Sequence, residues 1–161
     1  GTGEKIPTFD QVLSLFDGKA PMIVELKTAG DNYTALADAA VQALEGYHGL
    51  WCMESFDPRC IYALRKRHPQ VIRGQLAENF LRNKQNPAPF WLKFSLTYQL
   101  LNFLTKPDFT AYNFPHRKNL SMKLARALWG IQGVAWTLRS REEFDEAVKE
   151  GYLPIFEGFE P

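Results

Sequence analysis

Short apolar runs alternate along the chain with segments whose apolar residues recur at helical spacing. This alternation is typical of parallel strands joined by right-handed helical crossovers. The runs are apolar along nearly their whole length, which indicates a sheet covered by helices. Six runs predict strands, at residues 21–27, 49–56, 71–76, 108–113, 133–138 and 153–157.

Capping residues mark where several of the intervening helices begin. Thr8 is a suitable N-cap for a short helix near the amino end. Asp57 can cap the helix that begins at Pro58, and Ser140 with Glu143 three residues later forms a capping box. Two more helices are expected at about residues 33–44 and 120–129.

Polar and aromatic residues gather at the predicted strand ends, and parallel α/β folds place their active sites at the carboxyl ends of strands. A doubly wound sheet would concentrate such residues at one switch point. Here five or six strand ends carry them, which predicts one shared site at the mouth of an α/β barrel. These residues are Glu25, Lys27, Glu54 to Asp57, Arg73, Gln75, Tyr112, Asn113, Trp136, Thr137 and Glu157.

Residues 77–105 are longer than the other connections and predict a helical insertion within one domain that spans residues 1–161. From Pro89 to Leu104, apolar residues cover most of the circumference of a helix, so this part is expected to be buried or to lie against something apolar. It can pack as a lid over the barrel, or residues 89–104 can make peripheral contact with lipid.

Glu25 and Lys27 lie two residues apart, so both side chains leave the same face of their strand. The pair can be a structural ion pair near a strand end. A buried ion pair is costly unless it is well satisfied, which favours a function for one that points into a barrel. The carboxylate suits a hard divalent cation, and the ammonium can hold an adjacent phosphate.

The composition narrows the class of protein. At 161 residues and 45% hydrophobic content, the chain is long enough to bury a core. Its net charge is +1, which gives no indication of a nucleic-acid partner. Cys52 and Cys60 are too few for a disulfide scaffold, and there is no signal peptide or membrane span, so a reduced cytoplasmic protein is expected.

Five stretches of the chain occur in a distinctive order and spacing: Ile6-Pro7-Thr8-Phe9, Ile23-Val24-Glu25-Leu26-Lys27, Ser55-Phe56-Asp57-Pro58, Lys106-Pro107-Asp108-Phe109 and Ala135-Trp136-Thr137. In these stretches the chain resembles the glycerophosphodiester phosphodiesterase family. The resemblance implies a (β/α)8 barrel that hydrolyses small-molecule glycerophosphodiesters to glycerol 3-phosphate and an alcohol, with a divalent metal, Mg²⁺ or Ca²⁺.

The resemblance also implies roles for four residues. Glu25 matches a carboxylate ligand of the metal, and Lys27 matches the lysine that neutralises the phosphate. Trp136 matches an aromatic wall near the glycerol moiety. Glu54 lies where the family has a polar residue, which implies contact with the substrate or with the shell of the metal.

The family's two catalytic histidines and its Glu-x-Asp pair of metal ligands lie on the first two strands, which would precede Gly1. A barrel of this kind has about 250 residues, so roughly ninety are missing here. We therefore expect an incomplete TIM (β/α)8 barrel that lacks about the first two βα units. This C-terminal portion is expected to contain no catalytic residue, to bind metal weakly or not at all, and to be inactive alone.

The three histidines of the chain are not expected to replace the missing pair. His48 precedes a strand at its amino end, and His68 closes a helix, where a cation is favourable. His116 follows a strand near the mouth but matches no family motif.

An incomplete barrel leaves two strand edges open, so we expect oligomerisation or an exchange of elements. Two other functions remain open at this point. The scaffold can serve as a non-catalytic binding or interaction module, or it can belong to a related barrel that hydrolyses phosphoinositides or sphingomyelin.

Overall fold

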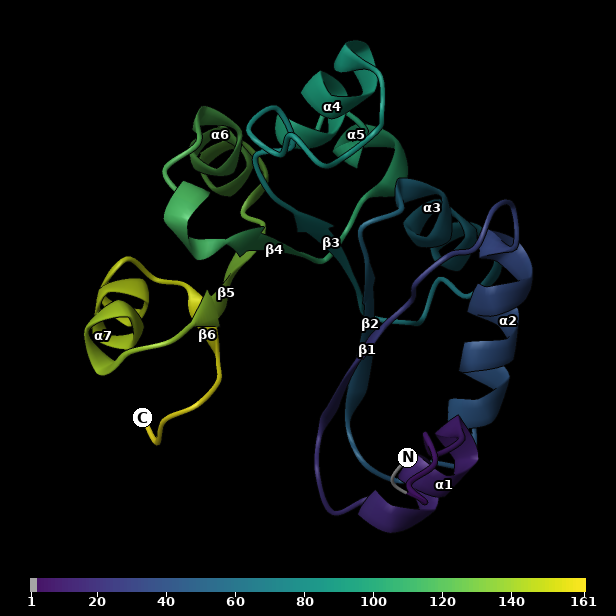
Figure 1. Cartoon of the computed structure of the whole chain (residues 1–161). Helices are drawn as coiled ribbons and strands as arrows, with labels where there is room; N and C mark the ends of the chain where they lie inside the picture. Colours follow the sequence, from purple (N-terminus) through teal and green to yellow (C-terminus); the bar gives the residue numbers. More distant parts are fainter. Residues whose placement is uncertain (1–2) are drawn as a thin grey trace.

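A computed structural model describes residues 3–161. Within these residues six parallel strands form one sheet, in the order in which they occur along the chain, and the sheet curls into a half-barrel with helices outside it (Figure 1). The expected incomplete α/β barrel is confirmed. The strands are β1 (Met22–Glu25), β2 (Trp51–Ser55), β3 (Arg73–Ala77), β4 (Phe109–Asn113), β5 (Gln132–Leu138) and β6 (Leu153–Phe156).

The helices begin largely where the capping residues predict. Thr8 and Gln11 form a complete capping box at the first helix, and Asp57 accepts a hydrogen bond from the Arg59 amide at the third. Ser140 accepts from the Glu143 amide, but the Glu143 carboxylate accepts from the Arg139 amide, one residue earlier than a capping box requires. Outside the insertion, the α-helices of the described residues are α1 (Phe9–Phe16), α2 (Tyr33–Leu44), α3 (Pro58–Arg67), α6 (Leu120–Trp129) and α7 (Arg141–Lys149).

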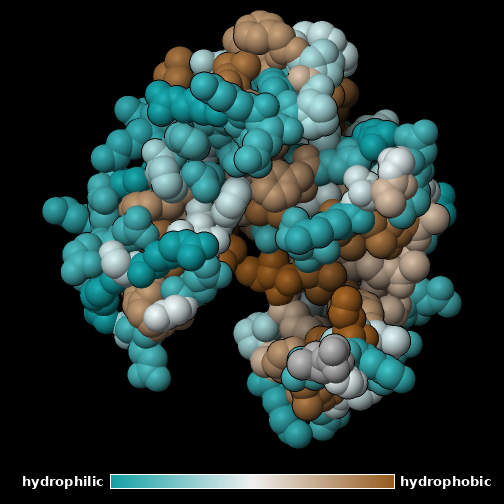
Figure 2. Space-filling view, in the orientation of Figure 1, coloured by the Kyte–Doolittle hydropathy of each residue, from teal (hydrophilic) through white to brown (hydrophobic). Residues whose placement is uncertain are grey.

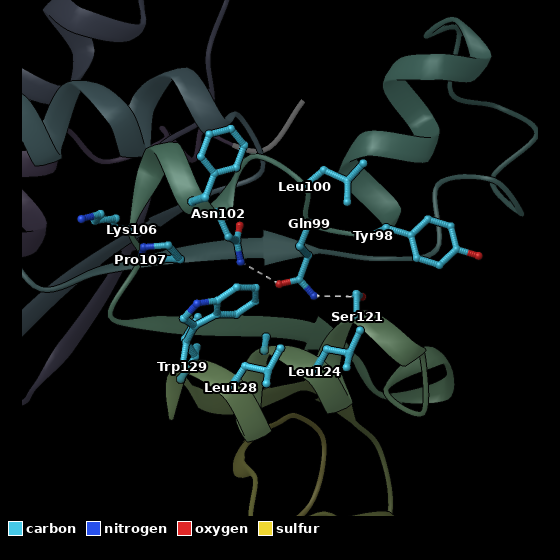
Figure 3. Close-up of a pocket in the computed structure, with 13 residues that line it drawn as sticks. Tyr98, Gln99, Leu100, Asn102, Lys106, Pro107, Ser121, Leu124, Leu128 and Trp129 are labelled. Atoms are coloured by element: carbon cyan, nitrogen blue, oxygen red, sulfur yellow. Dashed lines mark hydrogen bonds between the residues drawn. The ribbon is translucent and has the colours of Figure 1, made fainter.

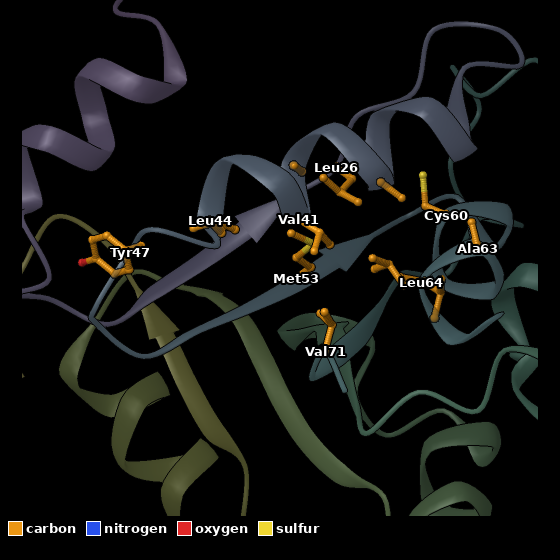
Figure 4. Close-up of a cluster of buried hydrophobic side chains, with 12 residues drawn as sticks. Leu26, Val41, Leu44, Tyr47, Met53, Cys60, Ala63, Leu64 and Val71 are labelled. Atoms are coloured by element: carbon orange, nitrogen blue, oxygen red, sulfur yellow. The ribbon is translucent and has the colours of Figure 1, made fainter. Parts of the chain in front are cut away.

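The main core lies between the sheet and its outer helices. Leu26, directly after β1, and Met53 of β2 pack against Val41 of α2 and Leu64 of α3 (Figure 4). A second face of the sheet, toward the inside of the barrel, carries a smaller cluster that includes Leu76. Because alternate residues of a strand point to opposite faces, this two-sided burial explains the nearly continuous apolar strands.

The insertion does not form one continuous helix. It contains α4 (Phe90–Thr97) and α5 (Asn102–Thr105), separated by a turn at Gln99, whose φ is 54°. The second half of the insertion lies in the outer helical layer, because the Tyr112 hydroxyl donates to the Thr97 carbonyl and Arg65 of α3 donates to the Leu104 carbonyl. Ser121 of α6 also donates to the Thr97 carbonyl. Residues 97–105 therefore lie between α3 and α6, and not over the mouth as a lid.

The inner side of the half-barrel is uncovered. A cavity of about 600 Å³ lies there, lined by apolar residues such as Ile23, Ile72 and Leu153. Figure 2 shows it as a hollow with apolar side chains at its base. Within residues 3–161, β1 and β6 each pair with a strand on one side only. In this part of the chain no helix is both long and apolar enough to span a bilayer.

Candidate functional site

The carboxyl ends of β1 and β2 bring two acidic side chains together. Glu25 and Glu54 are register partners of the parallel pair. Register partners point to the same face of a sheet, so both carboxylates lie at the inner side of the barrel mouth. The next partner of Glu54 across the sheet is Gly74, and the Phe109 ring occupies the place that a side chain there would take.

The two carboxylates differ in their exposure to solvent. Glu54 is only 7% exposed, and its Oε2 atom is buried without a hydrogen-bond partner in the described structure. Burial, with a smaller contribution from the nearby Glu25 charge, raises the pKa of Glu54 to about 7. Glu54 is therefore a group that can hold or release a proton near neutral pH.

Cys52 lies two residues before Glu54, on the same face of β2. Burial, with the Glu54 charge as a second cause, raises the pKa of this thiol to about 11. Cys52 is thus a neutral thiol at neutral pH, and it packs beside the inner apolar cluster. It does not add a metal ligand or a nucleophile to the site.

Lys27 lies at the rim of the mouth. Its Nζ atom is 3.4 Å from Oε2 of Glu25, and the two side chains are 79% and 32% exposed. An ion pair this exposed contributes little to stability. The ammonium is free to move toward an anion without a large loss of folding energy, which suits contact with a phosphate better than a structural role.

An aromatic wall stands at the same inner face. Trp136 of β5 is fixed because its Nε1 atom donates to the Ala111 carbonyl at 2.9 Å. Its ring meets Phe56 edge-on at 5.6 Å between centroids, and Phe56 meets Phe80 in the same way at 6.1 Å. The sequence indicated Trp136 and included Phe56 among the strand-end residues. It did not indicate Phe80, which comes from the loop after β3, where no periodicity marks an inward side chain.

Several strand-end residues lie away from this site. Arg73 is at the amino end of β3, where its guanidinium binds the Val71 and Lys106 carbonyls. Gln75 and Tyr112 lie on the helix-covered face, where Gln75 donates to the Ser55 carbonyl and Tyr112 to Thr97. The expectation that all strand ends share one site is wrong for these three residues, because the pleat sends every second side chain outward.

A polar network ties the ends of β1 and β2 together beneath the carboxylates. The Ser55 hydroxyl donates to the Leu26 carbonyl at 2.6 Å, and Thr28 donates to Asp57 at 3.0 Å. Burial raises the pKa of Asp57, but hydrogen bonds from Arg59 and Thr28 outweigh it and lower the pKa overall. This network connects the two loops from which the site is built, and only the capping role of Asp57 was visible in the sequence.

Among the described residues, no histidine makes a hydrogen bond or ion pair with Glu25 or Glu54. His68 ends α3, where its Nε2 atom is 2.7 Å from Oδ1 of Asp38. His48 is exposed before β2, and His116 ends a short 3-10 helix, η1 (Phe114–His116). Among residues 3–161 no three His, Cys, Asp or Glu side chains are grouped as a metal site would require.

Two carboxylates nevertheless fit one kind of metal binding. Mg²⁺ is often held by one or two carboxylates together with phosphate oxygens of a substrate and water. Glu25 and Glu54 are adjacent, and the Oε2 atom of Glu54 has no protein donor to displace. These residues could therefore hold a hard divalent cation when an oxyanion supplies further ligands.

The comparisons with known proteins give matches in structure but not in sequence. No family model and no curated protein matches the chain. A phosphodiesterase from Oleispira antarctica in complex with the product sn-glycerol-3-phosphate is similar, with a TM-score of 0.71 and 15% identity over 93% of this chain. A glycerophosphodiester phosphodiesterase from Parabacteroides distasonis has a TM-score of 0.69 and 14% identity over 96% of this chain.

The chain spans 56% of the Oleispira structure and 61% of the Parabacteroides structure. At this level of identity the likeness concerns the course of the backbone and not the site residues. The chain therefore has the fold of part of a glycerophosphodiester phosphodiesterase barrel, and the resemblance expected from its sequence is confirmed at the level of the fold.

Proposed function

We propose that this chain is part of a metal-dependent phosphodiesterase that hydrolyses glycerophosphodiesters to glycerol 3-phosphate and an alcohol. The observation that carries this proposal is the register pairing of Glu25 with Glu54 at a barrel mouth, with an unpartnered carboxylate oxygen and an exposed lysine beside it. A structure with the same fold contains sn-glycerol-3-phosphate, which supports the substrate class.

Each residue of the site has a separate role in this proposal. Glu25 holds a divalent cation, Mg²⁺ or Ca²⁺, whose chemistry when bound is to polarise the phosphoryl oxygens. Lys27 moves from its exposed pairing with Glu25 to neutralise the phosphate. Trp136 offers an apolar face to the carbon side of the glycerol moiety, and its fixed indole orients that face.

Glu54 acts as a second contact to the metal or substrate. Its pKa of about 7 lets it donate a hydrogen bond to a phosphate oxygen when protonated and accept a metal when ionised. A cation beside Glu25 favours the ionised form of Glu54, so we expect metal binding to release a proton.

We further propose that the 161-residue chain binds the product but does not hydrolyse the diester. General acid–base catalysis needs a proton carrier within hydrogen-bond reach of the reacting oxygens. None of the three histidines makes a hydrogen bond or ion pair with Glu25 or Glu54 in the described structure. Hydrolysis of glycerophosphocholine by the purified chain would contradict this part of the proposal alone.

Calorimetric titration with sn-glycerol 3-phosphate, with and without Mg²⁺ or Ca²⁺, tests the site. We expect binding that strengthens with metal, and a Glu25→Gln variant that loses this dependence. Glu45→Gln is the matched control, because Glu45 is an exposed C-cap of α2 outside the site. Equal metal dependence in Glu25→Gln and wild type would overturn the assignment of Glu25.

The open inner face also supports a proposal about assembly. β1 and β6 expose unpaired edges within residues 3–161, and the cavity between them is apolar. Exposed edges and apolar patches promote pairing with another chain. We propose that the 161-residue chain self-associates through this face, and sedimentation at several concentrations would show whether it remains a monomer.

A further inference from the structure

A second cavity lies on the outside of the barrel, between the turn after α4 and the helix α6. Its volume is about 880 Å³, within the range of small-molecule pockets. Figure 3 shows Lys106 and Pro107 at one end of it and Tyr98 at the other. The cavity lies in the outer helical layer, so it is separate from the site at Glu25 and Glu54.

One wall of the cavity is an apolar stripe of α6. Leu124, Leu128 and Trp129 lie at helical spacing on one face, and all three are exposed to solvent, at 44%, 66% and 65%. Leu100 and Phe103 add exposed apolar surface from the opposite side. Such a concentration of large exposed apolar side chains is unusual on a monomer and marks a binding surface.

The opposite wall contains a pair of buried amides. Nδ2 of Asn102 donates to Oε1 of Gln99 at 3.0 Å, and Nε2 of Gln99 lies 3.4 Å from Oγ of Ser121. Gln99 and Asn102 are each 8% exposed, and the Trp129 indole faces this pair across the cavity (Figure 3). Burying an amide group costs free energy unless its hydrogen bonds are complete. A purely structural role for these two amides would therefore destabilise the fold if any of their hydrogen bonds were missing.

These hydrogen bonds are not complete. Oδ1 of Asn102 accepts no hydrogen bond from residues 3–161, and it is not among the fully buried side-chain atoms without a partner, so a ligand can reach it. An acceptor on an otherwise apolar wall selects a ligand that brings a hydroxyl or amide donor. A carboxylate brings no donor, so an ionised fatty acid would leave this oxygen unpaired.

We propose that the cavity binds a neutral amphiphile, a single aliphatic chain that carries a hydroxyl group. The hydroxyl donates to Oδ1 of Asn102, and the chain lies along the stripe formed by Leu124, Leu128 and Trp129. The volume accommodates one such chain, and the apolar walls supply the affinity. This site does not depend on the phosphodiesterase proposal, because no residue of the barrel mouth contributes to it.

Decanol is the probe for this proposal, and nitrogen–proton correlation spectra are the readout. We expect decanol to shift the side-chain amide signals of Asn102 and the indole signal of Trp129. The Trp129 signal is assigned as the one that disappears in a Trp129→Phe variant. Decyl methyl ether has the same chain but no donor, and we expect it to bind about tenfold more weakly. Equal binding of the alcohol and the ether would overturn the role of Asn102.

Two tryptophan substitutions on α6 locate the ligand. Leu124→Trp places a larger side chain on the wall along which the aliphatic chain is proposed to lie, and it should weaken the shifts caused by decanol. Leu120→Trp is the matched control, because Leu120 is an exposed leucine one turn earlier that does not line the cavity. The proposal fails if decanol binds Leu124→Trp as it binds wild type, if decanoate binds more tightly than decanol, or if a second copy of the chain protects Trp129 and excludes decanol.

Discussion

Glu25 and Glu54 are direct partners across two parallel strands, yet only Glu54 is withdrawn from solvent. The difference arises from position, because β1 is at the edge of the sheet and β2 has a neighbour on both sides. The buried carboxylate of Glu54 therefore titrates near neutral pH. The predictions below begin with the consequences of this asymmetry.

Replacement of Glu54 by Gln is expected to stabilise the protein at high pH. Because folding raises the pKa of Glu54 from 4.5 to about 7, the folded state binds more protons between these values, and the free energy of unfolding falls as pH rises through this window. Above pH 7 this loss in the free energy of unfolding is complete and amounts to about 3 kcal/mol. Glu54→Gln should therefore be more stable than wild type at about pH 8 and equal to it at about pH 4. Urea unfolding at both pH values measures the difference.

Gly74→Ala is expected to destabilise the inner face of the barrel. A Cβ atom at this position would lie 2.1 Å from the ring of Phe109, which is buried and cannot turn away freely. Overpacking of this kind costs about 1–3 kcal/mol. Gly46→Ala is the control, since nothing lies within 4 Å of its added Cβ. A second change, Phe109→Leu, should recover part of the loss in thermal unfolding of Gly74→Ala.

Asp57→Ala is expected to loosen the two loops that carry the site. It removes the cap of α3 and the bonds to Thr28 and Arg59. The expected loss in the free energy of unfolding is about 2 kcal/mol, of which the cap contributes about 1 kcal/mol. Asp57→Asn retains the cap and should lose only about half as much. If both variants lose equal stability, the charge on Asp57 and not the cap is what matters.

The exposed aromatic residues of α4 are expected to contact lipid. Trp91 and Phe94 are 69% and 42% exposed, and no described residue covers them fully. The double variant Trp91→Ser with Phe94→Ser should weaken sedimentation with phosphatidylcholine vesicles at least about tenfold, because it removes two apolar anchors. Leu50→Ser removes an apolar side chain that is 82% exposed near the amino ends of the strands, and it should have no effect. Unchanged sedimentation of the α4 variant would rule out this contact.

Much of the fold is predictable because strand and helix signals are local. The apolar run that contains Glu25 and the cap at Asp57 each follow from a few neighbouring residues, and both are confirmed. The division of the insertion at Gln99 is not predictable, because apolar residues continue through the turn and no Gly or Pro marks it.

The site is less predictable, because the face of the sheet to which a side chain points depends on the register of its strand. Tyr112 and Trp136 are both aromatic residues near strand ends, yet Tyr112 points to the helices and Trp136 to the inside. A shift of one residue in either strand would exchange these faces. Register is set by pairing between distant segments, which no local pattern contains.

The sequence by itself determined the alternation of strands and helices, the class of barrel, and the nearness of Glu25 to Lys27 at a strand end. Only the tertiary structure decided that Glu54 is the buried carboxylate, that Lys27 lies at an exposed rim, and that a second cavity opens beside Asn102. The physical reason is that periodicity and capping act within a few residues. Burial, pKa and cavity shape depend on which distant segments pack together.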